Sequence, residues 1–205
     1  LHNSVALLEG GKVAEVRHKQ MLPNYGVFDE MRVFAPGRDP DPIPFRGIKL
    51  GVPICEDIWH EHVVATLKAR GADLLLVPNG SPFEATKHGA RMDHVRARIS
   101  ESGLPLAYVN QVGGQDELVF DGASFVMNTD FTVPLSMPAF DEDLVMTEWT
   151  RGEAGWTCAP GARAPDPEGL EAIYSACVLG LRDYVNKNRF PGVVLGLSGG
   201  IDSAI

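Results

Sequence analysis

The sequence predicts an α/β protein in which one large layered domain is followed by the start of a second α/β domain. Between residues 48 and 128, short apolar runs of strand length alternate with segments of helical periodicity. Residues 151–169 are rich in glycine and proline, and a helical segment, an apolar strand and a glycine-rich turn follow them. We therefore expect a first domain over residues 1–150, a linker over 151–169 and the start of a second domain over 170–205.

The first part of the chain predicts a hairpin, a turn and an exposed loop, in that order. Two β-prone runs, residues 4–9 and 12–16, are joined by a pair of glycines, which is typical of a β-hairpin. Turn residues at 22–26 end this pattern. The proline-rich stretch 35–44 is predicted to be an exposed loop.

The rest of the chain predicts strands covered by helices. Apolar runs predict five strands, over residues 48–54, 74–77, 104–110, 124–128 and 193–197. Helical spacing of apolar residues predicts three helices, over residues 60–70, 87–101 and 170–188. Since strands alternate with helices, the main domain is expected to be layered.

Charge and composition disfavour several classes of function. The 205 residues contain 18 Lys and Arg against 27 Asp and Glu, and the net charge of −9 disfavours general binding to nucleic acids or anionic membranes. No apolar run approaches the roughly 18–20 residues of a membrane span. Three cysteines without a C-x-x-C pair are typical of a cytoplasmic protein and argue against a structural zinc site. The His-Glu-His run at 60–62 has the wrong spacing for a shared metal on a helix, so no metal site is expected.

Both ends of the sequence predict a segment of a longer protein. The chain begins without Met, and it stops just after the glycine-rich turn.

Cys55 is the first candidate for chemistry. It ends the predicted strand 48–54 and is followed by two acidic residues and a predicted helix. Sites in open α/β sheets collect at the carboxyl ends of strands, and a helix N-terminus lowers the pKa of a thiol. Asp57 is predicted to cap that helix. The alternative is that Cys55 is simply a small buried apolar residue.

Lys19 and the residues after it add a second pattern. The run Lys19–Glu30, which contains Lys-x-x-Leu-Pro, precedes the sequence Cys55-Glu56-Asp57. Together these motifs resemble the nitrilase (carbon–nitrogen hydrolase) superfamily over about residues 4–128. The resemblance implies an α-β-β-α sandwich whose N-terminal part is missing, with Cys55 as the nucleophile and Lys19 as the partner of the thiolate and of the oxyanion. Glu30 resembles an additional glutamate that orients the lysine.

The general base of that family is expected upstream of this chain. The glutamates that precede Lys19 are Glu9 and Glu15. Both fall on the predicted hairpin, at positions that do not match the family's proton-accepting glutamate.

A weaker pattern concerns the substrate. In the glutamine-using branch of the superfamily, residues at the positions of Tyr25, Ser81 and Lys87 contact glutamine. The alternative for Ser81 and Lys87 is a helix cap and a surface charge. Three arginines on the predicted helix are expected to be solvated or ion-paired, namely Arg91, Arg96 and Arg98.

The glycine-rich turn predicts an anion-binding loop. It follows an apolar strand, and its backbone N–H groups and serine hydroxyls can form a cradle for phosphate. It lacks the endings of a Walker loop and of a dinucleotide-binding loop. Its Ser-Gly-Gly-x-Asp-Ser sequence resembles the ATP pyrophosphatase (PP-loop) family, whose domain is Rossmann-like. The implied ATP-binding residues are Gly196, Leu197, Ser198, Gly199, Gly200, Ile201, Asp202 and Ser203.

The order of the two motifs resembles the glutamine-dependent NAD synthetases. This resemblance implies that glutamine hydrolysis supplies ammonia for the ATP-dependent amidation of deamido-NAD, which releases AMP and pyrophosphate. It also implies Mg²⁺ with the ATP, no prosthetic group and a homo-oligomer. The alternatives are a stand-alone amidase of the nitrilase superfamily and a non-catalytic nitrilase-like or nucleotide-binding module.

Overall fold

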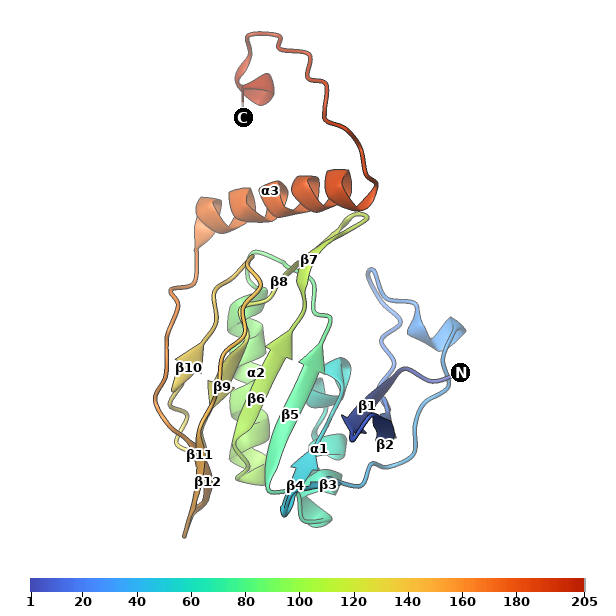
Figure 1. The fold of residues 1–205 in the computed structure, drawn as a ribbon, viewed down its shortest axis with the longest axis vertical. Coiled ribbons are helices and arrows are strands. Elements are labelled where there is room, and N and C mark those ends of the chain that lie inside the picture. Colours follow the sequence, from blue (N-terminus) through green and yellow to red (C-terminus); the bar gives the residue numbers. More distant parts are fainter. Residues whose placement is uncertain (205) are drawn as a thin grey trace.

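The computed structural model describes residues 1–204 and is built around a six-stranded mixed sheet (Figure 1). Its strands lie in the order β10-β9-β6-β5-β4-β3, and the three central ones, β4, β5 and β6, are parallel. The antiparallel strands β3, β9 and β10 complete the two edges. The strands are β3 (Ile43–Phe45), β4 (Ile48–Gly51), β5 (Leu74–Asn79), β6 (Leu106–Asn110), β9 (Phe125–Met127) and β10 (Leu135–Ser136).

Two helices, α1 (Glu61–Ala69) and α2 (Lys87–Ser102), cover one face of this sheet. The alternation of β5 decides which residues meet them. Leu75 and Val77 belong to the core shared with both helices, whereas Leu74 and Leu76 belong to the cluster on the opposite face. The sheet is therefore buried on both faces, as the continuous apolar runs of its parallel strands require.

Three hairpins surround the sheet. They are β1–β2 (Ser4–Glu9 and Lys12–His18), β7–β8 (Val112–Gln115 and Leu118–Asp121) and β11–β12 (Trp149–Gly152 and Gly155–Cys158). Val5 and Leu7 of the first hairpin, and Trp149 and Trp156 of the third, pack on the side of β5 away from the helices.

Helix α3 (Gly169–Lys187) lies across the β7–β8 hairpin (Figure 1). The two elements approach so closely that a Cβ atom added at Gly114 would lie 2.9 Å from the Cα atom of Gly180. Asp183 accepts a hydrogen bond from the Gly114 N–H group at 2.8 Å, and Lys187 donates one to the Gly114 carbonyl at 2.5 Å. This contact fixes α3 to the first domain.

Several elements differ from the sequence prediction. Residues 193–197 form no strand; their side chains are exposed, and nothing in residues 1–204 pairs with them. The strand predicted over 48–54 ends at Gly51, because Pro53 has no N–H group to donate. The loop predicted over 35–44 runs into β3, and the β11–β12 hairpin occupies the start of the segment predicted as a linker.

Two short 3₁₀ helices, η1 (Glu30–Arg32) and η2 (Cys55–Trp59), position residues of the site, and a third, η3 (Ile201–Ser203), lies near the end of the chain. No helix formed by residues 1–204 is long and apolar enough to cross a membrane.

Candidate active site

A cavity of about 350 Å³ opens at the carboxyl ends of the parallel strands, where open α/β sheets commonly bind ligands. It brings together Lys19, Glu30 and Cys55, which lie on three different elements. Among the residues that the structure describes, Glu30 is the only carboxylate on its wall. The lining residues are Asn3, Ser4, Val5, Lys19, Phe28, Glu30, Ile54, Cys55, Pro78, Asn79, Gly80 and Gln111.

Cys55 lies in a strained turn. Its φ of +50° is in the left-handed region, which non-glycine residues rarely adopt. The turn is held by the buried Asp57, whose Oδ2 accepts the Ile54 N–H at 2.9 Å. Asp57 Oδ1 also accepts the N–H groups of Gln20 and Met21, at 3.1 and 2.8 Å. The prediction that Asp57 is a helix cap needs correction, because it lies inside η2 and ties the Cys55 turn to the segment after Lys19.

Lys19 is buried together with its counter-ion. Its side chain is 1% exposed, and Nζ donates to Glu30 Oε1 at 2.7 Å. A buried ammonium without a partner would be costly, so the carboxylate of Glu30 compensates for the lost hydration. The second oxygen of Glu30 accepts the side-chain amide of Asn3 at 3.3 Å.

The protonation of Cys55 differs from the expectation. Burial is the largest effect and raises the pKa of the Cys55 thiol above its ordinary value. Lys19 and a backbone hydrogen bond from Gly80 lower this pKa, whereas Glu56 and Glu30 raise it further. Lys19 acts in the expected direction, but burial outweighs it. In this structure Cys55 is therefore a thiol, and its activation requires a base to remove the proton.

Of the residues predicted to contact glutamine, Tyr25 lies outside the Cys55 cavity. It lines an adjoining, mainly apolar cavity, and its hydroxyl donates to Glu56 Oε2 at 2.8 Å. Burial and this hydrogen bond raise the pKa of Tyr25 to about 12, so the hydroxyl stays a donor. Sequence reasoning missed Glu56 as a site residue. Its position next to Cys55 was the available signal.

The other two predicted contacts are engaged by protein groups. The Ser81 hydroxyl is buried and accepts a hydrogen bond from Arg91 Nε at 3.1 Å. Lys87 Nζ lies 2.5 Å from Glu84 Oε1 and 6.0 Å from the centre of the Trp59 ring. These ammonium and hydroxyl groups therefore have partners that a bound substrate would have to replace.

Arg91 is the buried member of the three arginines. Its Nη1 and Nη2 atoms donate to the two carboxylate oxygens of Asp121 at 2.7 and 2.8 Å. Nη2 also donates to the carbonyl groups of Ser81 and Pro82, at 2.9 and 3.2 Å. The expected ion pairing holds also for the remaining two, which pair along the helix as Arg96–Asp93 and Arg98–Glu101.

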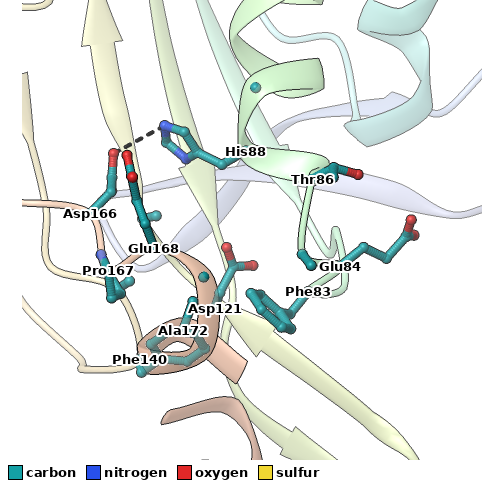
Figure 2. A pocket seen from close by; sticks show the side chains of 15 residues that line it. Phe83, Glu84, Thr86, His88, Asp121, Phe140, Asp166, Pro167, Glu168 and Ala172 are labelled. Atoms are coloured by element: carbon teal, nitrogen blue, oxygen red, sulfur yellow. Dashed lines mark ion pairs between the residues drawn. The ribbon is translucent and has the colours of Figure 1, made fainter. Parts of the chain in front are cut away.

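A second cavity of about 420 Å³ lies between the loop before α2 and the start of α3 (Figure 2). The rings of Phe83 and Phe140 meet edge to face with their centres 5.5 Å apart. His88 and Asp166 pair across the cavity at 3.1 Å, as the dashed line in Figure 2 marks. None of the residues predicted to be catalytic lines it.

The glycine-rich turn near the end of the chain is exposed and closed by its own hydrogen bonds. The hydroxyls of Ser198 and Ser203 are 3.0 Å apart, and the N–H of Gly200 donates to the Ser198 hydroxyl at 3.3 Å. Gly199 has a φ of +80°, which explains the need for glycine there. In the described part of the chain, no group of three His, Cys, Asp or Glu residues is placed to hold a metal ion.

Comparison with known proteins decides the family. Residues 1–157 match the family model described as "Carbon-nitrogen hydrolase". The chain belongs to the carbon-nitrogen hydrolase family. Beyond this carbon-nitrogen hydrolase domain, residues 173–205 match the model described as "NAD synthase".

The relatives carry both parts. All of this chain is 48% identical to the glutamine-dependent NAD(+) synthetase of Rhodobacter capsulatus and 42% identical to that of Acinetobacter baylyi. In each case it covers 37% of the relative, so it spans little more than a third of their length.

Solved structures confirm the predicted nitrilase-like fold. The glutamine-dependent NAD+ synthetase of Acinetobacter baumannii, in complex with ADP, matches 99% of this chain and 38% of its own with a TM-score of 0.91 and 44% identity. An amidase from Nesterenkonia sp. AN1 matches 62% of this chain and 49% of its own with a TM-score of 0.54 and 32% identity. A carbon-nitrogen hydrolase from Helicobacter pylori, 21% identical, shares the fold over 93% of this chain and 66% of its own with a TM-score of 0.65.

Proposed function

We propose that this chain is part of a glutamine-dependent NAD synthetase and contains its glutamine-hydrolysing site. The observation that carries the proposal is the buried Lys19–Glu30 pair in one cavity with Cys55. It is supported by the match of residues 173–205 to NAD synthase and by relatives that carry the same two parts in one protein.

In the proposed reaction the sulfur of Cys55 attacks the carboxamide carbon of glutamine. The thiol proton passes to the base, which is predicted to lie upstream of Leu1. The Lys19 ammonium stabilises the negative charge that develops on the carboxamide oxygen. The C–N bond then breaks, the nitrogen takes up a proton and leaves as ammonia, and a thioester remains on Cys55. Water hydrolyses this thioester, so that glutamate leaves and the thiol is restored.

The raised pKa of Cys55 makes the base essential to this scheme. A buried neutral thiol is a weak nucleophile until its proton is removed. Glu30 is occupied by Lys19 and Asn3, which suits a residue that positions the ammonium rather than one that shuttles protons. A covalent route is supported by the Nesterenkonia amidase, in which acrylamide adds to the active-site cysteine.

Charged groups next to Cys55 would recognise the amino-acid end of glutamine. Glu56 carries a buried carboxylate held by Tyr25, and this carboxylate suits the α-ammonium group. Lys87 suits the α-carboxylate once it leaves Glu84, and the hydroxyl of Ser81 adds a polar contact. A zwitterion would then replace ion pairs that the protein already makes.

The loop from Gly196 to Ser203 is proposed to bind the phosphates of ATP. Its support is the match of this segment to NAD synthase and the ADP bound by the Acinetobacter baumannii relative. The backbone N–H groups around Gly199 and Gly200 would contact phosphate oxygens. Mg²⁺ would accompany the nucleotide and neutralise part of its charge, with deamido-NAD as the second substrate.

We also propose a cytoplasmic homo-oligomer. The exposed side of α3 supports association, because its apolar residues Leu170, Tyr174, Leu181 and Tyr184 are 50–84% exposed in this chain.

The proposal is tested with the full-length enzyme by comparing glutamine and ammonia as nitrogen donors. Cys55→Ala is expected to abolish NAD formation from glutamine and to leave NAD formation from ammonia intact, because only the first reaction needs the thiol. Glutamine-dependent synthesis by Cys55→Ala would refute the proposal. A stand-alone amidase would instead hydrolyse amides without forming NAD from deamido-NAD and ATP.

A further inference from the structure

Asn3 contacts both members of the buried ion pair. It lies one residue before β1 and lines the Cys55 cavity. Its backbone carbonyl accepts the N–H of Lys19 at 2.8 Å, and its side-chain amide donates to Glu30 Oε2 at 3.3 Å. One residue therefore holds the main chain of the lysine and the side chain of the glutamate.

The amide of Asn3 completes the surroundings of the Glu30 carboxylate. Oε1 takes the Lys19 ammonium, and Oε2 takes Asn3, so each oxygen has a donor. The Glu30 side chain is 16% exposed, whereas that of Lys19 is 1% exposed. Without the second donor, Glu30 is free to turn towards the open cavity, and the buried ammonium would then lose the only carboxylate on the cavity wall.

We propose that Asn3 is a positioning residue of the amide-hydrolysing site, which fixes Glu30 and through it the direction of the Lys19 ammonium. The inference rests on the proposed function of this cavity. The donor has to be neutral as well as correctly shaped. An aspartate at position 3 has nearly the same shape, but it would place a second carboxylate against Glu30, and like charges at hydrogen-bond distance repel.

The test compares Asn3→Ala and Asn3→Asp with the wild type in the full-length enzyme. A well-aimed ammonium acts on the transition state, so Asn3→Ala is expected to lower the glutaminase kcat about tenfold or more while KM stays within about twofold. Asn3→Asp is expected to lose more than Asn3→Ala, although it preserves the packing. His2→Ala is the matched control, because it removes the neighbouring hydrogen bond from the His2 ring to Ala35 without touching Glu30.

A second measurement separates positioning from folding. The rate at which iodoacetamide alkylates Cys55 is expected to change in both Asn3 variants and to stay constant in His2→Ala, at temperatures where all remain folded. Equal kcat values for His2→Ala and both Asn3 variants, or a loss confined to the melting temperature, would overturn the inference. Failure of the proposed function would appear differently, as glutaminase activity in Cys55→Ala.

Discussion

The ion pair between Arg91 and Asp121 gives a sharp prediction about stability. The side chains are 1% and 8% exposed, and two hydrogen bonds of 2.7 and 2.8 Å join them. Asp121→Ala would leave the guanidinium buried without its counter-charge. Breaking a buried pair from one side costs about 3–5 kcal/mol. For a chain of this size each kcal/mol lowers Tm by about 2–4 °C, so the expected decrease is about 6–20 °C.

The same variant is expected to affect the substrate site. Arg91 also holds the hydroxyl and carbonyl of Ser81, so a displaced guanidinium would loosen the turn that is proposed to contact glutamine. The KM for glutamine should therefore rise in Asp121→Ala at temperatures below its unfolding transition.

A matched control lies on the same helix. Asp93 pairs with Arg96 at 3.1 Å, but its side chain is 79% exposed. An exposed pair contributes about 0–1 kcal/mol, so Asp93→Ala should leave Tm and KM almost unchanged. The assay is thermal unfolding of the full-length protein, followed by fluorescence, with glutaminase kinetics on the same samples. If the two alanine variants lowered Tm equally, the burial argument would be refuted.

Two further predictions concern the thiol and the contact with α3. The pH midpoint for alkylation of Cys55 should lie above that of a free thiol; it should rise further in Lys19→Met, which removes an attractive charge, and fall in Glu30→Gln, which removes a repulsive one. Opposite shifts would contradict this electrostatic account. Gly114→Ala should destabilise the protein by about 1–3 kcal/mol because the new Cβ meets the backbone of α3, whereas Gly152→Ala, which has open space, should not. Equal melting temperatures would show that α3 is not held at this contact.

Elements with strong local patterns were predictable from sequence. The helix predicted over residues 87–101 is α2, and the run at 74–77 lies in β5, because periodicity and apolar length are local properties. The strand predicted over 193–197 had the right composition but has no partner within residues 1–204, and a strand without a partner lacks its hydrogen bonds.

The contacts of the site depend on residues that are distant in sequence. Motifs indicated Cys55, Lys19 and Glu30, and the structure places them around one cavity, while their chemical roles stay predictions. Nothing local pairs Arg91 with Asp121, which lies 30 residues away. The direction of the Cys55 pKa was also hidden, because it depends on how deeply the fold buries the sulfur.

The central claim is that the sulfur of Cys55 forms a covalent bond with the substrate carbon. It is tested most directly by quenching the full-length enzyme during turnover of glutamine and measuring the mass of its proteolytic peptides. The account predicts a glutamyl thioester on the peptide that contains Cys55, sensitive to hydroxylamine and absent from Cys55→Ala. A glutamyl group on any other residue, or glutamine hydrolysis by Cys55→Ala at the wild-type rate, would contradict it.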